Sequence, residues 1–191
     1  MTMSMDDREL IRLVQEGDEM AFGRIVTGYK DRIVNYLYQF TGDYQKAVEL
    51  AQETFIRVFF KANQYRPVAP LSSWIYAIAS NLAKTEMKRS YRHQTVSLEA
   101  IAAHEVQQNV YAEDPPDSGL LKNLREALDS LHPRYRLPVV LKDMEGFSQE
   151  EIAQILKKPV GTIKARISRG RGFLKKKLEK AVAGNEDSAR N

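Results

Sequence analysis

The chain has 191 residues, with 29 Lys and Arg against 25 Asp and Glu, and it has no Cys. This length suits one or two modest domains, and the lack of Cys excludes disulfides and thiolate metal sites. There is no apolar run of about 18 residues and no charged-then-apolar leader, so we expect no membrane insertion and a location in the cytoplasm.

The charge is unevenly distributed along the chain. Residues 1–94 have a net charge of +2, residues 95–119 of −5, and residues 120–191 of +7. This pattern of a mildly positive N-terminal part, an acidic middle segment and a basic C-terminal part indicates nucleic acid as the partner.

Helical periodicity dominates the sequence and no segment alternates as a strand does, so we predict an all-α protein of two small helical domains. Four helices are expected in a first domain, residues 1–94, and they fall at 6–16, 18–41, 43–63 and 72–92. Residues 95–117 are polar and acidic and end in two prolines, which predicts a flexible acidic linker.

A second helical domain is expected over residues 118–184, followed by a frayed tail at 185–191. Its helices should run from 118 to 130 and from 133 to 144, and Pro138 should kink the second of them. A helix-turn-helix follows: Ser148 and Glu151 form a capping box, and Lys157 with Lys158 makes the turn.

The helix after this turn has two distinct faces. At 100° per residue, Ile163, Ile167, Gly170 and Leu174 should face inward. The outward side has small residues and cations, which suits a helix lying close to base edges in the major groove. An ordinary solvated basic face is the alternative, although residues 157–180 contain ten Lys and Arg against one acid. The outward residues are Lys164, Ala165, Ser168, Arg169 and Arg171.

The helix that begins after Asp43 also separates into two sides. One side is assigned to the core: Ala47, Val48, Ala51, Phe55, Val58 and Phe59. The other mixes carboxylates with apolar groups, which is typical of a protein-binding face, or else of a central helix buried on both sides. These two interpretations stay open from periodicity alone. The residues of this second side are Glu49, Gln52, Glu53, Ile56 and Phe60.

In the helix after Ser72, Ile75, Ile78, Ala79 and Leu82 should face the core. The far side combines one aromatic ring, one amide and several cations, which suits single-stranded DNA. The alternative is that Trp74 is partly buried packing and the remaining residues are solvated. The far-side residues are Trp74, Asn81, Lys84, Lys88 and Arg92.

Three ordered blocks give this chain a resemblance to a known family. They are Gly42 to Phe55, Leu71 to Lys84, and Leu131 to Leu174. Together they resemble the sigma-70 family of bacterial transcription initiation factors, in its extracytoplasmic-function (ECF) group. The resemblance implies an ECF sigma factor that binds core RNA polymerase through the β′ clamp helices and the β subunit, recognises the −35 and −10 promoter elements and promotes melting of the DNA.

The resemblance also assigns roles to residues. Glu49, Gln52 and Glu53 would contact the clamp helices, with Ile56 and Phe60 as apolar anchors. Asn81, beside Trp74, would hold a flipped base of the −10 element, and Lys84, Lys88 and Arg89 would follow its backbone. The −35 element would be read by Lys164, Ala165, Arg166, Ser168, Arg169 and Arg171. An anti-sigma factor is the implied regulator.

The sequence departs from the family pattern at a few positions. Lys46 and Val48 stand where acids are frequent, Pro138 is unusual in its helix, and Ser168 occupies a position that can be bulkier. As a free coil the linker would span about 26 Å, and about 76 Å fully extended, against about 70 Å for two turns of duplex. We therefore expect the free protein to bind promoter duplex poorly.

Two other classes of protein are weighed against this one. A dimeric helix-turn-helix repressor or activator would bind DNA directly, without polymerase. An enzyme is disfavoured because His93, His104 and His132 lack metal-ligand spacing and no Gly-rich phosphate loop is present. We expect no catalytic residue, no metal and no cofactor.

Overall fold

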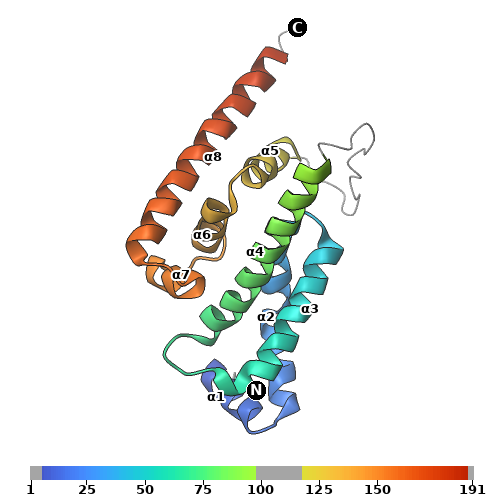
Figure 1. The fold of residues 1–191 in the computed structure, drawn as a ribbon, viewed down its shortest axis with the longest axis vertical. Helices are drawn as coiled ribbons and strands as arrows, with labels where there is room; N and C mark the ends of the chain where they lie inside the picture. Colours follow the sequence, from blue (N-terminus) through green and yellow to red (C-terminus); the bar gives the residue numbers. More distant parts are fainter. Residues whose placement is uncertain (1–5, 98–117, 189–191) are drawn as a thin grey trace.

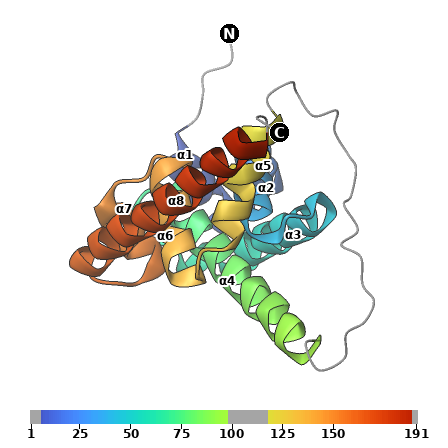
Figure 2. The same ribbon diagram turned by 90° about the horizontal axis from the view of Figure 1, so that it is seen from above.

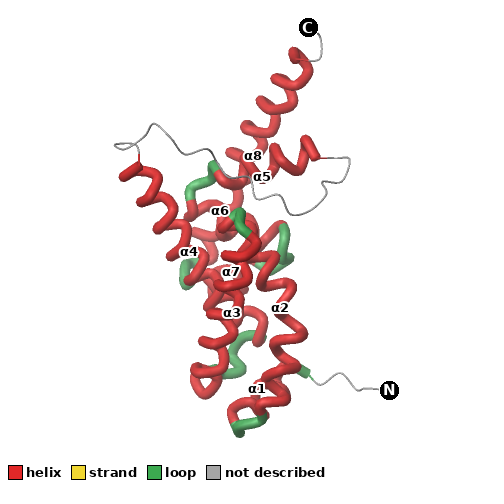
Figure 3. The backbone as a smooth tube through the Cα atoms, turned by 90° about the vertical axis from the view of Figure 1, so that its right-hand side faces the viewer, coloured by secondary structure: helices red, strands yellow, loops and turns green. Residues whose placement is uncertain are grey.

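The computed structural model describes residues 6–97 and 118–188, and side chains over residues 6–89 and 123–180. Every regular element within these ranges is a helix (Figure 3), which confirms the all-α prediction. Most of the expected linker and the last residues of the expected tail lie outside the described residues.

The first five elements form the N-terminal bundle, drawn from blue to green in Figure 1. Polar side chains fix where its helices begin: the Asp18 carboxylate accepts hydrogen bonds from the backbone N–H groups of Met20 and Ala21, and Asp43 accepts one from Lys46. The elements are α1 (Asp7–Gln15), α2 (Glu19–Thr41), α3 (Tyr44–Lys61), the 3-10 turn η1 (Ala62–Gln64) and α4 (Leu71–Ser97).

The remaining helices form the C-terminal bundle. The capping box between Ser148 and Glu151 is present, and Lys157 ends α7 in the left-handed conformation with φ 50°. The predicted helix-turn-helix is therefore confirmed as α7 followed by α8. The helices are α5 (Ser118–Asp129), α6 (Pro133–Asp143), α7 (Gln149–Leu156) and α8 (Val160–Ser188).

Two helices are longer than expected. Helix α4 begins at Leu71 and continues to Ser97, and α8 continues to Ser188, past the expected start of the tail. Helix α6 includes Pro138, as expected, and the predicted kink there stays a prediction. A proline there removes one N–H, which leaves only the Arg134 carbonyl without its partner inside the helix, close to the start of α6.

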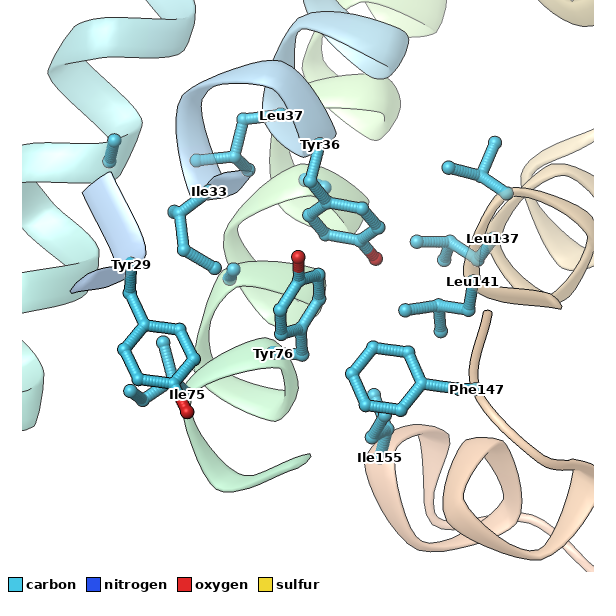
Figure 4. Close-up of a cluster of buried hydrophobic side chains, with 14 of the residues drawn as sticks. Tyr29, Ile33, Tyr36, Leu37, Ile75, Tyr76, Leu137, Leu141, Phe147 and Ile155 are labelled. Carbon is cyan, nitrogen blue, oxygen red and sulfur yellow. The ribbon is translucent and has the colours of Figure 1, made fainter. Parts of the chain in front are cut away.

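The two bundles lie side by side and share one hydrophobic cluster. Helix α7 packs against α4, and Figure 2 shows α3 on the side of the molecule away from α7 and α8. In Figure 4 the ring of Tyr76 on α4 lies between Tyr36 of α2 and Phe147, the residue before the capping box. The core of each bundle thus continues into the other.

Candidate polymerase and DNA interfaces

The outer side of α3 is open to solvent. Ile56 is 51% exposed and Phe60 79% exposed, although both are large apolar side chains. Glu49 and Gln52 are exposed beside them. A helix buried on both sides is therefore excluded, and the mixed apolar and acidic face predicted from the sequence is accessible to a partner.

The carboxylates of this face are paired within the helix. Lys46 Nζ lies 3.0 Å from Glu49 Oε2, and Arg57 Nε lies 2.7 Å from Glu53 Oε1. Both pairs are at the surface, where such pairs contribute about 0–1 kcal/mol, so a partner can exchange them at little cost. The unusual Lys46 thus orients Glu49 along the helix.

Phe59 was wrongly assigned to the core. It is 41% exposed, and its described ring contacts are edge-on to Phe22 at 5.0 Å and to Phe60 at 5.7 Å. Near the end of α3, Phe22 of α2 covers only part of the ring. The exposed face of α3 is therefore more apolar than the sequence indicated.

The far side of α4 is exposed along most of its described length. Asn81, Lys84, Lys88 and Arg89 are all exposed, while the side chain of Arg92 lies outside the described residues. Trp74 is half-buried: it packs against the hydrophobic cluster, with its ring 5.4 Å from that of Tyr65. Trp74 therefore has the packing role that the alternative interpretation gave it, and one part of its ring remains accessible.

Helix α8 has the two faces expected from its periodicity. Ile163, Ile167 and Gly170 are buried, and Leu174 packs against the same cluster. A Cβ on Gly170 would lie 2.7 Å from Val139 Cγ2, so α8 approaches α6 very closely at this point. The close approach fixes the orientation in which α8 presents its outward face.

On that outward face Lys164, Ala165, Ser168 and Arg169 are exposed. Arg166 is half-buried. The Arg171 guanidinium donates to the Asp143 carboxylate, with its Nε 3.0 Å from Oδ2, and this hydrogen bond raises the pKa of Arg171. The six residues predicted for this face are thus not equivalent, because Arg171 is already engaged by α6.

The sequence did not reveal the residues that join the bundles. Tyr76 is not among the residues singled out from the sequence, yet it is 0% exposed and its hydroxyl donates to the Glu145 carboxylate. Burial raises the pKa of Glu145 above its usual value of 4.5, and the Tyr76 hydrogen bond and the Arg32 charge act in the opposite direction. Burial, followed by the bond to Glu145, also raises the pKa of Tyr76. Periodicity finds the buried side of a helix, but it does not name the element that buries it.

Over the described ranges, no group of three or more His, Cys, Asp or Glu side chains could hold a metal ion. Within the same residues, no helix has the length and apolar character needed to cross a membrane.

A helix-turn-helix with a basic outer face, joined to a second helical bundle, is typical of a DNA-binding transcription factor. The comparisons with known proteins are specific. The family described as Sigma-70 region 2 matches residues 25–93, and the family described as Sigma-70, region 4 matches residues 121–174.

Two relatives match over nearly the whole chain. The ECF RNA polymerase sigma factor SigE of Mycolicibacterium smegmatis is 37% identical over 182 residues, covering 91% of this chain and 68% of the relative. SigW of Bacillus subtilis, also an ECF RNA polymerase sigma factor, is 34% identical over 184 residues, covering 92% and 98%. The chain belongs to the ECF group of the sigma-70 family of RNA polymerase sigma factors. It is accordingly a transcription initiation factor and not an enzyme.

Two solved structures share the fold. CnrH, in complex with the cytosolic domain of CnrY, has a TM-score of 0.69 at 22% identity, with 91% of this chain and 97% of that chain covered. The sigma factor RpoE of Bartonella quintana, in complex with the anti-sigma factor NepR, has a TM-score of 0.66 at 24% identity, with 83% and 96% covered. These likenesses support the two-bundle architecture.

Proposed function

We propose that this sigma factor docks onto core RNA polymerase through the outer face of α3. The observation that carries the proposal is the exposure of Ile56 and Phe60 among the carboxylates of Glu49 and Glu53. Apolar anchors surrounded by charge are typical of protein interfaces, where the anchors supply affinity and the charges supply orientation and speed. The proposed contacts are the β′ clamp helices, with the β subunit as a further contact of the assembled enzyme.

Promoter recognition is divided between α4 and α8. Asn81 holds an unpaired base of the −10 element next to the accessible part of the Trp74 ring, and Lys84, Lys88 and Arg89 bind the phosphates. The outward face of α8 reads the −35 element in the major groove. In this assignment Arg171 contributes less than Arg169, because Asp143 already engages its guanidinium.

Control by an anti-sigma factor completes the proposal. RpoE of Bartonella quintana was solved in complex with the anti-sigma factor NepR. An inhibitor of this kind would have to cover α3, α4 or α8, the three exposed faces on which the proposed activity depends. We place this regulation in the cytoplasm, where core polymerase and promoter DNA are found.

Charge reversal on α3 tests the docking. The double variant Glu49→Lys/Glu53→Lys is expected to reduce run-off transcription with core polymerase at least tenfold, because it replaces two attractive contacts with repulsive ones. The matched control is Glu9→Lys/Glu16→Lys on α1, where both carboxylates are likewise exposed and paired within the helix, to Arg12. Equal transcription by the two double variants would contradict the assignment of α3. In a separate capture experiment, failure of the wild-type chain to bind core polymerase would favour a repressor that binds DNA directly.

A further inference from the structure

The Trp74 ring is supported by a tyrosine of the loop that leads into α4. The Tyr65 ring lies 5.4 Å from the Trp74 ring. Tyr65 is only 4% exposed, whereas Trp74 is half-buried. The position of Tyr65 therefore helps to decide which part of the Trp74 ring remains accessible to a base.

Hydrogen bonds within this loop, residues 62–70, fix its shape. The Tyr65 hydroxyl donates to the Ala69 carbonyl at 2.8 Å. Arg66 Nη1 donates to the carbonyls of Asn63 and Tyr65, at 2.8 Å and 2.9 Å. These bonds hold the loop together, but they do not fix its place relative to the helices.

The last residue of α1 ties this loop to the rest of the bundle. Gln15 Nε2 lies 2.9 Å from the Ala62 carbonyl oxygen and 3.3 Å from the Tyr65 carbonyl oxygen. A glutamine amide has two N–H donors, so both carbonyls can be served at once. Each carbonyl also accepts from within the loop, Ala62 from the Tyr65 N–H and Tyr65 from Arg66. Loss of the Gln15 amide should therefore release the loop from α1 without unfolding it.

Helix α1 also holds the start of α4. Tyr29 of α2 donates to the carboxylate of Asp7, the first residue of α1. Tyr29 shares a second side-chain hydrogen bond with Ser72, the second residue of α4. Figure 1 shows α1 at the end of the bundle where α4 begins. The segment before Trp74 is thus tied to α1 near both of its ends, through Gln15 at one and through Tyr29 at the other.

We propose that α1 positions the −10 reader, with Gln15 holding the loop so that Tyr65 presents the Trp74 ring to an unpaired base. This inference rests on the proposed function of α4. Gln15 precedes residue 25, where the match to Sigma-70 region 2 begins, so the family match gives it no role. Gln15 is a positioning residue in this proposal, because it acts through Tyr65 and Trp74.

Fixing the ring matters because stacking depends on geometry. A base stacks on an aromatic ring whose face is open and correctly oriented. A Trp74 ring that can turn must be ordered when DNA binds, and that ordering lowers the affinity. Gln15 thus contributes to the affinity for the melted strand before any DNA is present.

Intrinsic fluorescence tests the position of Trp74 in the free, full-length chain. Trp74 is the only Trp in the sequence, so the Trp emission comes from this ring alone. Gln15→Met keeps a side chain of similar length and removes the N–H donors. It should raise the acrylamide quenching constant of Trp74, because the released loop uncovers more of the ring.

Binding of the melted strand supplies the functional readout. The probe is a labelled single strand with the non-template −10 sequence of a promoter found by mapping transcript starts, and the protein is the holoenzyme assembled from core polymerase and the full chain. Gln15→Met should weaken this binding about fivefold, the effect of one more side chain that must be ordered. Gln15→Lys, whose ammonium group can donate to the same carbonyls, should restore part of the affinity.

Gln45→Met is the matched control, because it makes the same change at an exposed position on α3. It should alter neither the quenching of Trp74 nor the affinity for the strand. Capture of core polymerase should be equal for Gln15→Met and the wild-type chain, since the proposed docking face is untouched.

Wild-type strand binding by a folded Gln15→Met chain would overturn the positioning role. A loss of core polymerase capture by the same factor would also overturn it, because it would indicate a general loss of structure. So would a Gln15→Lys chain that binds the strand as weakly as Gln15→Met, because the N–H donors would then not be what positions the ring. If Gln15→Met does not fold, wild-type strand binding by Gln15→Asn, whose amide is one methylene shorter, would overturn the role instead.

The holoenzyme experiment separates this inference from the proposed function. Failure of the wild-type holoenzyme to bind the strand would contradict the proposed function of α4 and the inference with it. Wild-type binding that does not depend on Gln15 would contradict the inference alone.

Discussion

Gly170 is the residue at which α8 comes closest to α6. A methyl group added there would lie 2.7 Å from Val139 Cγ2 and 3.4 Å from Tyr135 Cβ. Valine in a helix has essentially one rotamer, so it cannot turn away, and the backbones would have to separate. This position therefore requires glycine for packing, although its φ is helical.

We expect Gly170→Ala to lower the free energy of unfolding by about 1–2 kcal/mol, since overpacking costs about 1–3 kcal/mol and improved helix propensity returns up to about 1 kcal/mol. Gly172→Ala is the control, because a Cβ there meets nothing within 4 Å. It should raise stability by about 0.5–1 kcal/mol. Urea unfolding of both full-length variants measures the difference, and a shift of the same sign in both would contradict the tight α6–α8 contact.

At the scale of the helices, the sequence was informative about the positions of the elements and about most buried faces. The capping acids Asp18 and Asp43 and the capping box at Ser148 are local signals, and each marks a helix start in the structure. The exposure of Phe59 was not predictable in the same way. The exposure of Phe59 depends on how far α2 extends over the end of α3. The sequence pattern of α3 alone carries no information about that.

The outward face of α8 leads to a prediction about two arginines. Arg169 is exposed, whereas Arg171 donates to Asp143. Arg169→Ala should reduce transcription from a promoter with an intact −35 element about tenfold, the effect of losing one base or phosphate contact. Arg171→Ala should reduce it less than threefold, since Asp143 already engages that side chain. Both variants can be compared by run-off transcription, using a promoter identified by mapping transcript starts. Equal losses of transcription would show that the Arg171–Asp143 ion pair opens on DNA.

At the scale of the whole molecule, the arrangement of the bundles could not be predicted. The sequence indicated two domains and an acidic linker, and linker length alone permits many separations. What fixes this arrangement is the contact of Tyr76 with Glu145 and Phe147, residues about seventy positions away that no periodic pattern connects to it. Such a contact requires the shapes of both bundles to be known.

Glu145 gives the contact between the two bundles a dependence on pH. The groups that face it are Tyr76 of α4 and Arg32 of α2, and Tyr36 of α2 lies behind Tyr76. Burial dominates, so the pKa of Glu145 is higher where the two bundles are in contact than where they are separated and the carboxyl is solvated. The contact between the bundles is therefore favoured by the protonated carboxyl. It is strongest on the acid side of the ordinary value of 4.5 and weakens as pH rises through the raised pKa.

The expected result is a larger fraction of chains with separated bundles at neutral pH than near pH 5. It can be measured in moderate urea as the distance between spin labels at Gln45→Cys on α3 and Gln154→Cys on α7, both exposed positions in a chain without Cys. Glu145→Gln keeps a side chain that accepts from Tyr76 but does not titrate, so its bundles should stay in contact with no change across this range. If the separated fraction of the wild-type chain falls as pH rises, or if Glu145→Gln shows the same dependence as the wild type, another group controls the contact.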